Sequence, residues 1–183
     1  MALTFADGGE DPLRRLRPAL PGLLLAVTTL LFGFGLGIVF GLNEDAIKSR
    51  LAASAAAVHE SVYQGDSAAG KAVLDKSWVY MQRAHLHAGG LGTSAIGLIL
   101  LVVLLGTRPA VKRAIGLGLG AGALGYSVFW LWAGFRAPGL GSTGAAKESL
   151  QWLALPSSGA VVIATAAVAV LCLIAVTGRR QPD

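Results

Sequence analysis

Four long apolar runs constrain the fold of this chain more than any other feature. They cover residues 20–42, 84–105, 114–135 and 159–177. Each is close to the roughly 20 residues that a helix needs to cross the hydrocarbon of a bilayer. Because lipid cannot satisfy exposed backbone groups, the runs are expected to be helices rather than open strands. We therefore predict an all-α integral membrane four-helix bundle, a single domain over residues 1–183 that is surrounded by the lipid bilayer.

The composition agrees with a membrane environment and indicates no chemistry of its own. Hydrophobic residues make up 54% of the chain and charged residues 14%, too few charges for the surface of a water-soluble domain of this size. Cys172 is the one cysteine, so no internal disulfide forms. The chain has no phosphate-binding loop after a strand, no serine nucleophile motif and no carboxylate inside an apolar run. We do not expect it to act alone as an enzyme or as a transporter.

The distribution of basic residues predicts the orientation. Arginines and lysines gather at residues 14–17, 108–113 and 179–180, and short segments of this kind stay in the cytoplasm. All four tryptophans then fall at the outer interface, as in an aromatic belt: Trp78, Trp130, Trp132 and Trp152. We predict a multi-pass protein of the bacterial cytoplasmic (inner) membrane, with its N-terminus and C-terminus in the cytoplasm. The net charge of +5 therefore needs no nucleic-acid partner.

Residues 43–83 are predicted to form an outer amphipathic helical loop. Asn43 can cap a helix, and apolar residues then recur every three or four positions: Ile47, Leu51, Ala55, Val58 and Val62. Residues 64–70 resemble a turn, and a second helix is expected to run from Lys71 into the second span.

The loop after the third span contains a shorter predicted helix. Residues 145–153 are expected to form one interfacial helix. Residues 156–158 should begin the fourth span, and Gly178 should end it.

Glycines at four-residue spacing predict how the helices pack. Gly33, Gly37 and Gly41 share one face of the first span, whereas the third span has two such faces, Gly116 with Gly120 and Gly118 with Gly122. Small residues at this spacing let helix backbones approach closely in lipid. We expect helices of this chain to use these faces. The alternatives are a flat ligand such as a haem, or a helix of a partner.

His85 and His87 open the second span and are the candidate site. Histidine is costly in a membrane segment and often binds something or faces a cavity. Residues two apart diverge by about 200 degrees around a helix, so the two cannot share one ion. His85 should point into the bundle, and His87 should point to the side of Arg83.

Three occupancies of this pair remain open. One imidazole could ligate a haem while the other, or Arg83, meets a propionate. Copper or zinc would need further ligands, which His59, Glu60 or Asp75 could supply if the outer loop folds back. The pair could also be solvated or hydrogen-bonded, with no ligand at all.

The run from Arg83 to His87, followed by small residues and an apolar span, resembles a known motif. It is similar to the histidine-x-histidine opening of the second helix in small four-helix membrane proteins related to the haem-copper oxidase catalytic subunit. This resemblance implies one haem b or copper site, on His85 or His87. Later helices of the large oxidases supply further histidines, but the third and fourth spans here contain none, so a haem-copper centre is not expected.

Two functional hypotheses follow from the sequence. The first is a haem- or metal-binding accessory subunit of a respiratory membrane complex, with His85 or His87 at its site. The second is a non-catalytic assembly or scaffold membrane protein that packs against a partner.

Overall fold

A computed structural model describes residues 11–178, and this range contains helices and no strand. The helical elements, in chain order, are α1 (Pro12–Leu16), the 3-10 helix η1 (Arg17–Ala19), α2 (Leu20–Ala56), α3 (Ser67–Leu104), α4 (Pro109–Arg136), α5 (Thr143–Glu148) and α6 (Gln151–Thr177). Four of the helical segments, built on α2, α3, α4 and α6, are long and apolar enough to span a membrane. The predicted all-α four-helix bundle is confirmed.

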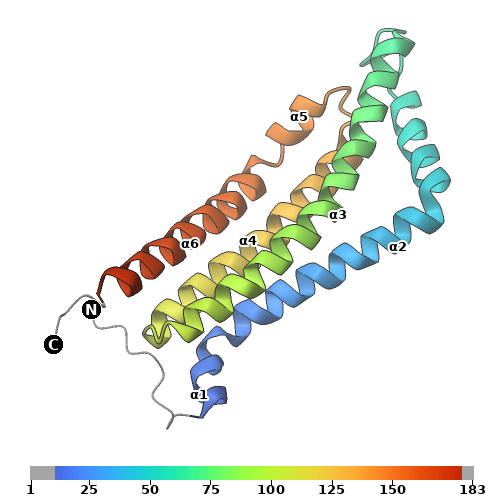
Figure 1. Ribbon diagram of the computed structural model, residues 1–183. Helices are drawn as coiled ribbons and strands as arrows, with labels where there is room; N and C mark the ends of the chain where they lie inside the picture. The colour runs from blue at the N-terminus through green and yellow to red at the C-terminus, as the bar shows by residue number, and fades with distance from the viewer. Residues whose placement is uncertain (1–10, 179–183) are drawn as a thin grey trace, which may run out of the picture.

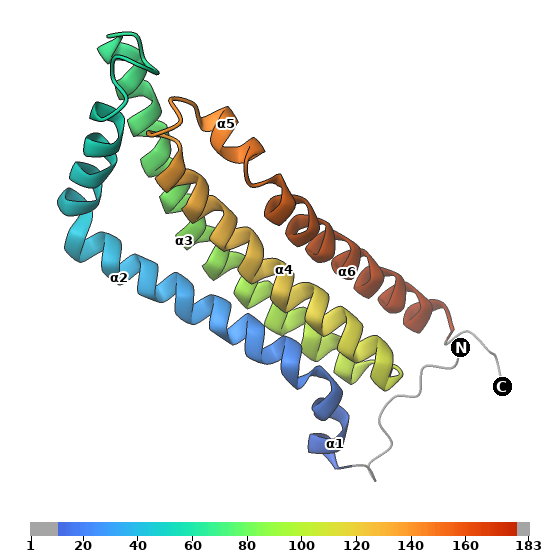
Figure 2. The ribbon, with the colours of Figure 1, turned by 180° about the vertical axis from the view of Figure 1, so that it is seen from behind.

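The four long helices lie lengthwise beside one another (Figures 1 and 2). α4 packs against α2, α3 and α6, whereas α6 packs almost entirely on α4. Half of the most apolar stretch of α4 is buried, compared with 17% of that of α6. We call the end with the α2–α3 connection and α5 the loop end, and the end with α1 and the α3–α4 turn the termini end. α4 is therefore the central helix, and α6 is peripheral.

Glycines of α4 form the contact with α2. A Cβ on Gly120 would overlap the carbonyl oxygen of Gly22 and would come within 2.9 Å of the Cβ of Leu25. A Cβ on Gly22 would overlap the backbone of Gly116. The face of Gly116 and Gly120 thus packs α4 on α2 at the distance that only glycine allows. Gly22 was not singled out in the sequence, because no second glycine follows it at four-residue spacing.

The second glycine face of α4 contacts α6. A Cβ on Gly122 would lie 2.7 Å from the carbonyl oxygen of Ser157, and one on Gly118 would lie 3.2 Å from the Cβ of Ala164. The two predicted faces of this helix therefore serve two different neighbours. At the loop end a further glycine, Gly134, packs against Met81 of α3, with 2.6 Å between an added Cβ and the Cγ of that methionine.

The glycine face of α2 is used only in part. A Cβ on Gly33 would lie 2.9 Å from the Cβ of Ala88 of α3, but one on Gly41 would meet nothing within 4 Å. Gly41 lies two residues before a kink at Asn43, whose φ of −131° and ψ of 24° are not helical. The expected contact at Gly41 therefore does not form among the described residues, and beyond the kink α2 turns back toward α3 (Figures 1 and 2).

The predicted helix boundary at Asn43 is present as a kink between two helical segments of α2, but the Asn43 side chain does not cap the second segment. Its side-chain amide donates to the carbonyl oxygen of Val39 at 3.3 Å, and α2 continues through the kink to Ala56. Leu51 and Ala55 of the predicted stripe are buried, but Val58 and Val62 follow the end of the helix. The outer arm of α2 is therefore one amphipathic helix, shorter than expected.

The α2–α3 connection also differs from the predicted turn. α3 begins at Ser67 rather than Lys71, because the Asp66 carboxylate accepts from the backbone N–H groups of Ala68 and Ala69. From there α3 runs unbroken into the second span, as predicted. The buried hydroxyl of Tyr63 donates to the carbonyl oxygen of Pro138 at 2.7 Å and joins this connection to the α4–α5 loop.

A short helix follows the third span, as predicted, but its predicted bounds of 145–153 are wrong. α5 ends at Glu148, and α6 begins at Gln151, five residues before the predicted start at Pro156. Pro156 lies inside α6, five residues after the helix begins. Its missing N–H removes one backbone hydrogen bond from the second turn. The predicted end is correct, since Gly178 caps α6 with its N–H on the carbonyl oxygen of Ile174.

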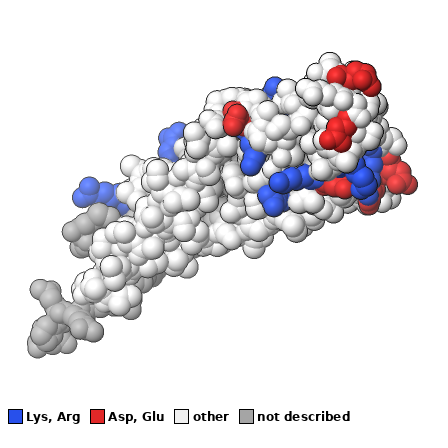
Figure 3. All heavy atoms as spheres, turned by 90° about the horizontal axis from the view of Figure 1, so that it is seen from above, with Lys and Arg blue, Asp and Glu red and all other residues white. Residues whose placement is uncertain are grey.

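Charged side chains avoid the middle of the molecule. Figure 3 shows a broad uncharged surface along the helices, with most of the acidic side chains visible in this view gathered toward the loop end. At the termini end Lys112 is only 6% exposed, and its Nζ donates to the carbonyl oxygen of Arg15 at 3.4 Å. The basic segment before α2 and the first turn of α4 thus contact each other. Arg179 and Arg180 lie outside the described residues.

Candidate functional site

The two histidines of α3 face different helices. α3 lies between α2 and α4, and the divergence of about 200 degrees turns His85 toward α2 and His87 toward α4. The sequence assigned the buried face to His85. The face of His87 is buried as well, because Tyr80, about two turns earlier on that side, is only 2% exposed.

His85 sits in a gap that a glycine leaves. Its Nδ1 lies 2.8 Å from the carbonyl oxygen of Gly33, and its Cε1 lies 2.9 Å from where a Cβ on Gly37 would be. Only a protonated Nδ1 can donate to a carbonyl, so this contact places the lone pair on Nε2. The imidazole is partly buried. His85 therefore has one nitrogen held by α2 and one without a described partner.

His87 belongs to an aromatic cluster between α3 and α4. Its ring stacks on that of Tyr126, with centroids 5.2 Å apart and planes 13° apart. The ring of Trp130 meets His87 edge-on at 5.9 Å and Tyr80 at 4.9 Å. We call these four residues, Tyr80, His87, Tyr126 and Trp130, the aromatic cluster. Its stacking holds His87 in place without a ligand.

Two cations lie against the aromatic cluster at the loop end. The Arg83 guanidinium carbon lies 5.0 Å from the ring centroid of Trp130 and 5.5 Å from that of Tyr80. Lys147 of α5 reaches the same tyrosine, with its Nζ 6.0 Å from the centroid. The sequence placed His87 and Arg83 on one side of α3. It did not reveal Lys147, whose contact depends on how α5 folds back.

His59 lies apart from the span, in the α2–α3 connection beside Tyr63 and Lys71. Within residues 11–178 no three His, Cys, Asp or Glu side chains come together as a group that could hold a metal ion. The fold-back of the outer loop that would bring His59, Glu60 or Asp75 to the histidines of α3 is thus not seen among the described residues. Of the expected cofactors, a haem held by a single axial histidine demands the fewest ligands.

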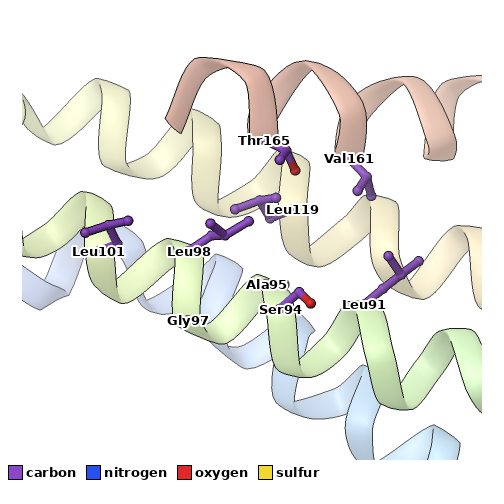
Figure 4. A pocket seen from close by; sticks show the side chains of 9 residues that line it. All are labelled: Leu91, Ser94, Ala95, Gly97, Leu98, Leu101, Leu119, Val161 and Thr165. Atoms are coloured by element: carbon purple, nitrogen blue, oxygen red, sulfur yellow. The ribbon is translucent and has the colours of Figure 1, made fainter. Parts of the chain in front are cut away.

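An open groove runs between α3 and α6, with α4 as its floor. Figure 4 shows Leu91, Ser94, Leu98 and Leu101 following one another along α3, with Val161 and Thr165 of α6 opposite and Leu119 of α4 between them. Its volume is about 570 Å³. The groove exists because α6 packs on α4 and hardly touches α3.

The fold and this surface define a multi-pass integral membrane protein of four spanning helices in a lipid bilayer. Comparison of the chain with known protein families, with curated proteins and with solved structures finds no match.

Proposed function

We propose that this chain is a non-catalytic accessory protein of the bacterial cytoplasmic membrane that packs against a partner membrane protein through the outward face of α2. Both chain ends lie on the cytoplasmic side in this proposal, as the basic residues at the termini end favour. The partner is a larger membrane complex, and the surface that meets it is a seam of five residues on α2.

The single observation that carries the proposal is this seam, which comprises Leu24, Thr28, Leu31, Gly35 and Ile38. The three large residues recur every seven positions and are 68%, 64% and 62% exposed. Thr28 and Gly35, four residues after a leucine, lie between them and are also exposed. Alternation at spacings of four and three is the pattern by which one helix packs along another.

Gly35 has no role in the internal packing. A Cβ there would meet nothing within 4 Å, whereas Gly33 and Gly37 each contact α3. A glycine inside a helix costs about 1 kcal/mol relative to alanine, so its presence on an exposed face calls for a reason. Close approach of a helix from another chain supplies one, since α2 and α4 already use glycine in this way inside the bundle.

Site-specific photo-crosslinking in native membranes tests this proposal. A photoreactive residue at position 35 should give one protein adduct of defined mass, whereas the same residue at Ile163 of α6, 71% exposed to lipid, should give none. Leu31→Ala should weaken the adduct at position 35. Adducts of equal yield at both positions, or lipid adducts alone at position 35, would contradict the proposal.

A second candidate, the haem-binding accessory subunit, is favoured by the His85 contact. Histidines that ligate metals commonly hold one ring N–H on a carbonyl or carboxylate, which orients the other nitrogen, and Nδ1 of His85 has such a contact with Gly33. A haem b bound through Nε2 of His85 would supply one-electron transfer. Copper has less support, because the described residues bring no further ligands together there.

An absorption spectrum of the purified protein from haem-sufficient cells separates the two candidates. A reducible Soret band that His85→Ala abolishes and His87→Ala only shifts would support the haem-binding subunit. A colourless protein of native stability favours the first proposal.

A further inference from the structure

One face of α3 carries a cationic site at the loop end and the apolar groove further along. Arg83, His87, Leu91 and Ser94 recur at intervals of three and four residues, so they lie in one line along the helix. Arg83 contacts the aromatic cluster, and the mouth of the groove begins at Leu91. From this continuity we infer that the α3–α6 side of the bundle binds one anionic phospholipid, with its phosphate at Arg83 and Lys147 and an acyl chain in the groove.

The cationic part of the site consists of Arg83 and Lys147, and neither has an acidic partner among the described residues. Neither Arg83 nor Lys147 pairs with a carboxylate among residues 11–178, although Lys48 pairs with Glu44 and Lys71 with Asp75 at the same end. Arg83 and Lys147 come from different helices and meet at one ring, that of Tyr80. Two such cations complement a phosphate oxygen, to which charge-assisted hydrogen bonds are about twice as strong as neutral ones.

A buried donor lies in the same cluster. Trp130 is 9% exposed, and its Nε1 is buried without a hydrogen-bond partner in the described part of the chain. Buried indole N–H groups usually find an acceptor. The indole N–H of Trp130 therefore has no acceptor within residues 11–178, and the aromatic cluster has cations beside it but no anion, which a phosphate group supplies.

The distance between Arg83 and the groove suits an acyl chain whose phosphate lies at Arg83 and Lys147. Leu91 lies about 12 Å along α3 from Arg83, within the roughly 15 Å of hydrocarbon that one leaflet provides. An acyl chain that starts at the level of Arg83 thus reaches the mouth of the groove. Its walls are apolar apart from the hydroxyls of Ser94 and Thr165, and a Cβ on Gly97 would meet nothing within 4 Å. Hydrocarbon fills such a groove inside a bilayer.

Native mass spectrometry of the detergent-purified protein tests this inference with phosphatidylglycerol and phosphatidylcholine as probes. The parent should retain one phosphatidylglycerol in preference to phosphatidylcholine. Arg83→Gln and Lys147→Gln should each lower this retention about tenfold, as the loss of one charge-assisted contact predicts. Arg83→Lys keeps the charge and should keep the preference. Lys71→Gln, which removes a charge 76% exposed at the same end, should have no effect.

Variants in the groove distinguish a lipid from a free anion. Ser94→Phe, close to the mouth of the groove, should lower the retention of both phospholipids, whereas Gly159→Phe, at an open glycine of α6, should not. If Arg83→Gln and Lys147→Gln fold normally and retain phosphatidylglycerol like Lys71→Gln, the inference is wrong. It is also wrong if inorganic phosphate displaces the lipid while Ser94→Phe has no effect, since the site would then take a free anion.

Discussion

His85 Nδ1 lies 2.8 Å from the carbonyl oxygen of Gly33, and this hydrogen bond joins α3 to α2 in the part of the bundle where Gly37 leaves room for the imidazole ring. The contact connects the two most distinctive sequence features, the histidine pair and the glycine face of the first span. It gives His85 a structural role whether or not a cofactor binds.

The first prediction is a coupling between His85 and Gly37. Gly37→Ala should lower the free energy of unfolding of the parent by about 1–2 kcal/mol, because the new methyl group would press on Cε1 of His85. In the His85→Ala background the same change should be neutral or stabilising by up to about 1 kcal/mol, since the methyl group then occupies an empty space in a helix. Thermal unfolding of the four proteins in detergent gives this comparison. Equal effects of Gly37→Ala in both backgrounds would show that the two residues do not touch.

The second prediction concerns the central helix. Gly120→Leu should destabilise the bundle by about 3 kcal/mol or more, because its side chain would overlap the backbone of α2 around Gly22. Gly41→Leu is the matched control, since a Cβ at Gly41 meets nothing within 4 Å, and it should melt like the parent or slightly higher. Similar melting of both variants would mean that α4 does not approach α2 as closely as described here.

Hydropathy and residue spacing anticipated much of this fold. Four runs long enough to span a bilayer determine the number of spanning helices, and glycines at two registers of α4 predicted two close helix contacts, which the structure makes with α2 and α6. The position of the break at Asn43 was predicted from the sequence, but its form was not, because an asparagine that follows a glycine-rich span can either cap a new helix or sit in a kink. The burial of both faces of α3 was missed for a different reason. Whether a helix packs against one neighbour or two depends on its place in the bundle. The spacing of residues within one helix does not determine that place.

The candidate site was predictable only within α3. The divergence of His85 and His87 follows from helix geometry, and so does the alignment of His87 with Tyr80 and Arg83. Their partners Gly33, Tyr126 and Lys147 lie on other helices, dozens of residues away in the sequence. Only the packed structure shows which of them meet.

The third prediction is a pH dependence that arises outside the spans. Burial raises the pKa of the Tyr63 hydroxyl above its ordinary value of 10.0. The folded state thus holds this proton more tightly than the unfolded state, and the resulting stability is fully present below pH 10.0 and is lost as the pH rises further. Tyr63→Phe should lower the free energy of unfolding by about 1 kcal/mol at neutral pH.

Comparing Tyr63→Phe with the parent separates the effect of the Tyr63 hydroxyl on stability from the effects of other groups that titrate at high pH. The difference in unfolding free energy between the two proteins should shrink above pH 10.0. A difference that stays constant through this range would show that the hydroxyl titrates alike in both states.

The fourth prediction is the orientation in the membrane. Reporter fusions after Arg113 and near Gly65 should report the cytoplasm and the opposite compartment, respectively, because the basic segments at the termini end are retained inside. Reports from the same compartment would overturn the four-span topology. Reports from reversed compartments would overturn only the orientation.

The mass of the protein released gently from its own membrane, measured in lipid discs, tests the central proposal most directly. The parent should carry the additional mass of one partner protein, and the Gly35→Leu variant should lose it while melting like the parent, because a Cβ at position 35 would meet no neighbouring helix within 4 Å among residues 11–178. Gly159→Leu, at an open glycine on α6, should keep the partner. If the parent and both variants all have the mass of the single chain, or if Gly35→Leu keeps the same partner as the parent, the outward face of α2 is not the surface through which this protein acts.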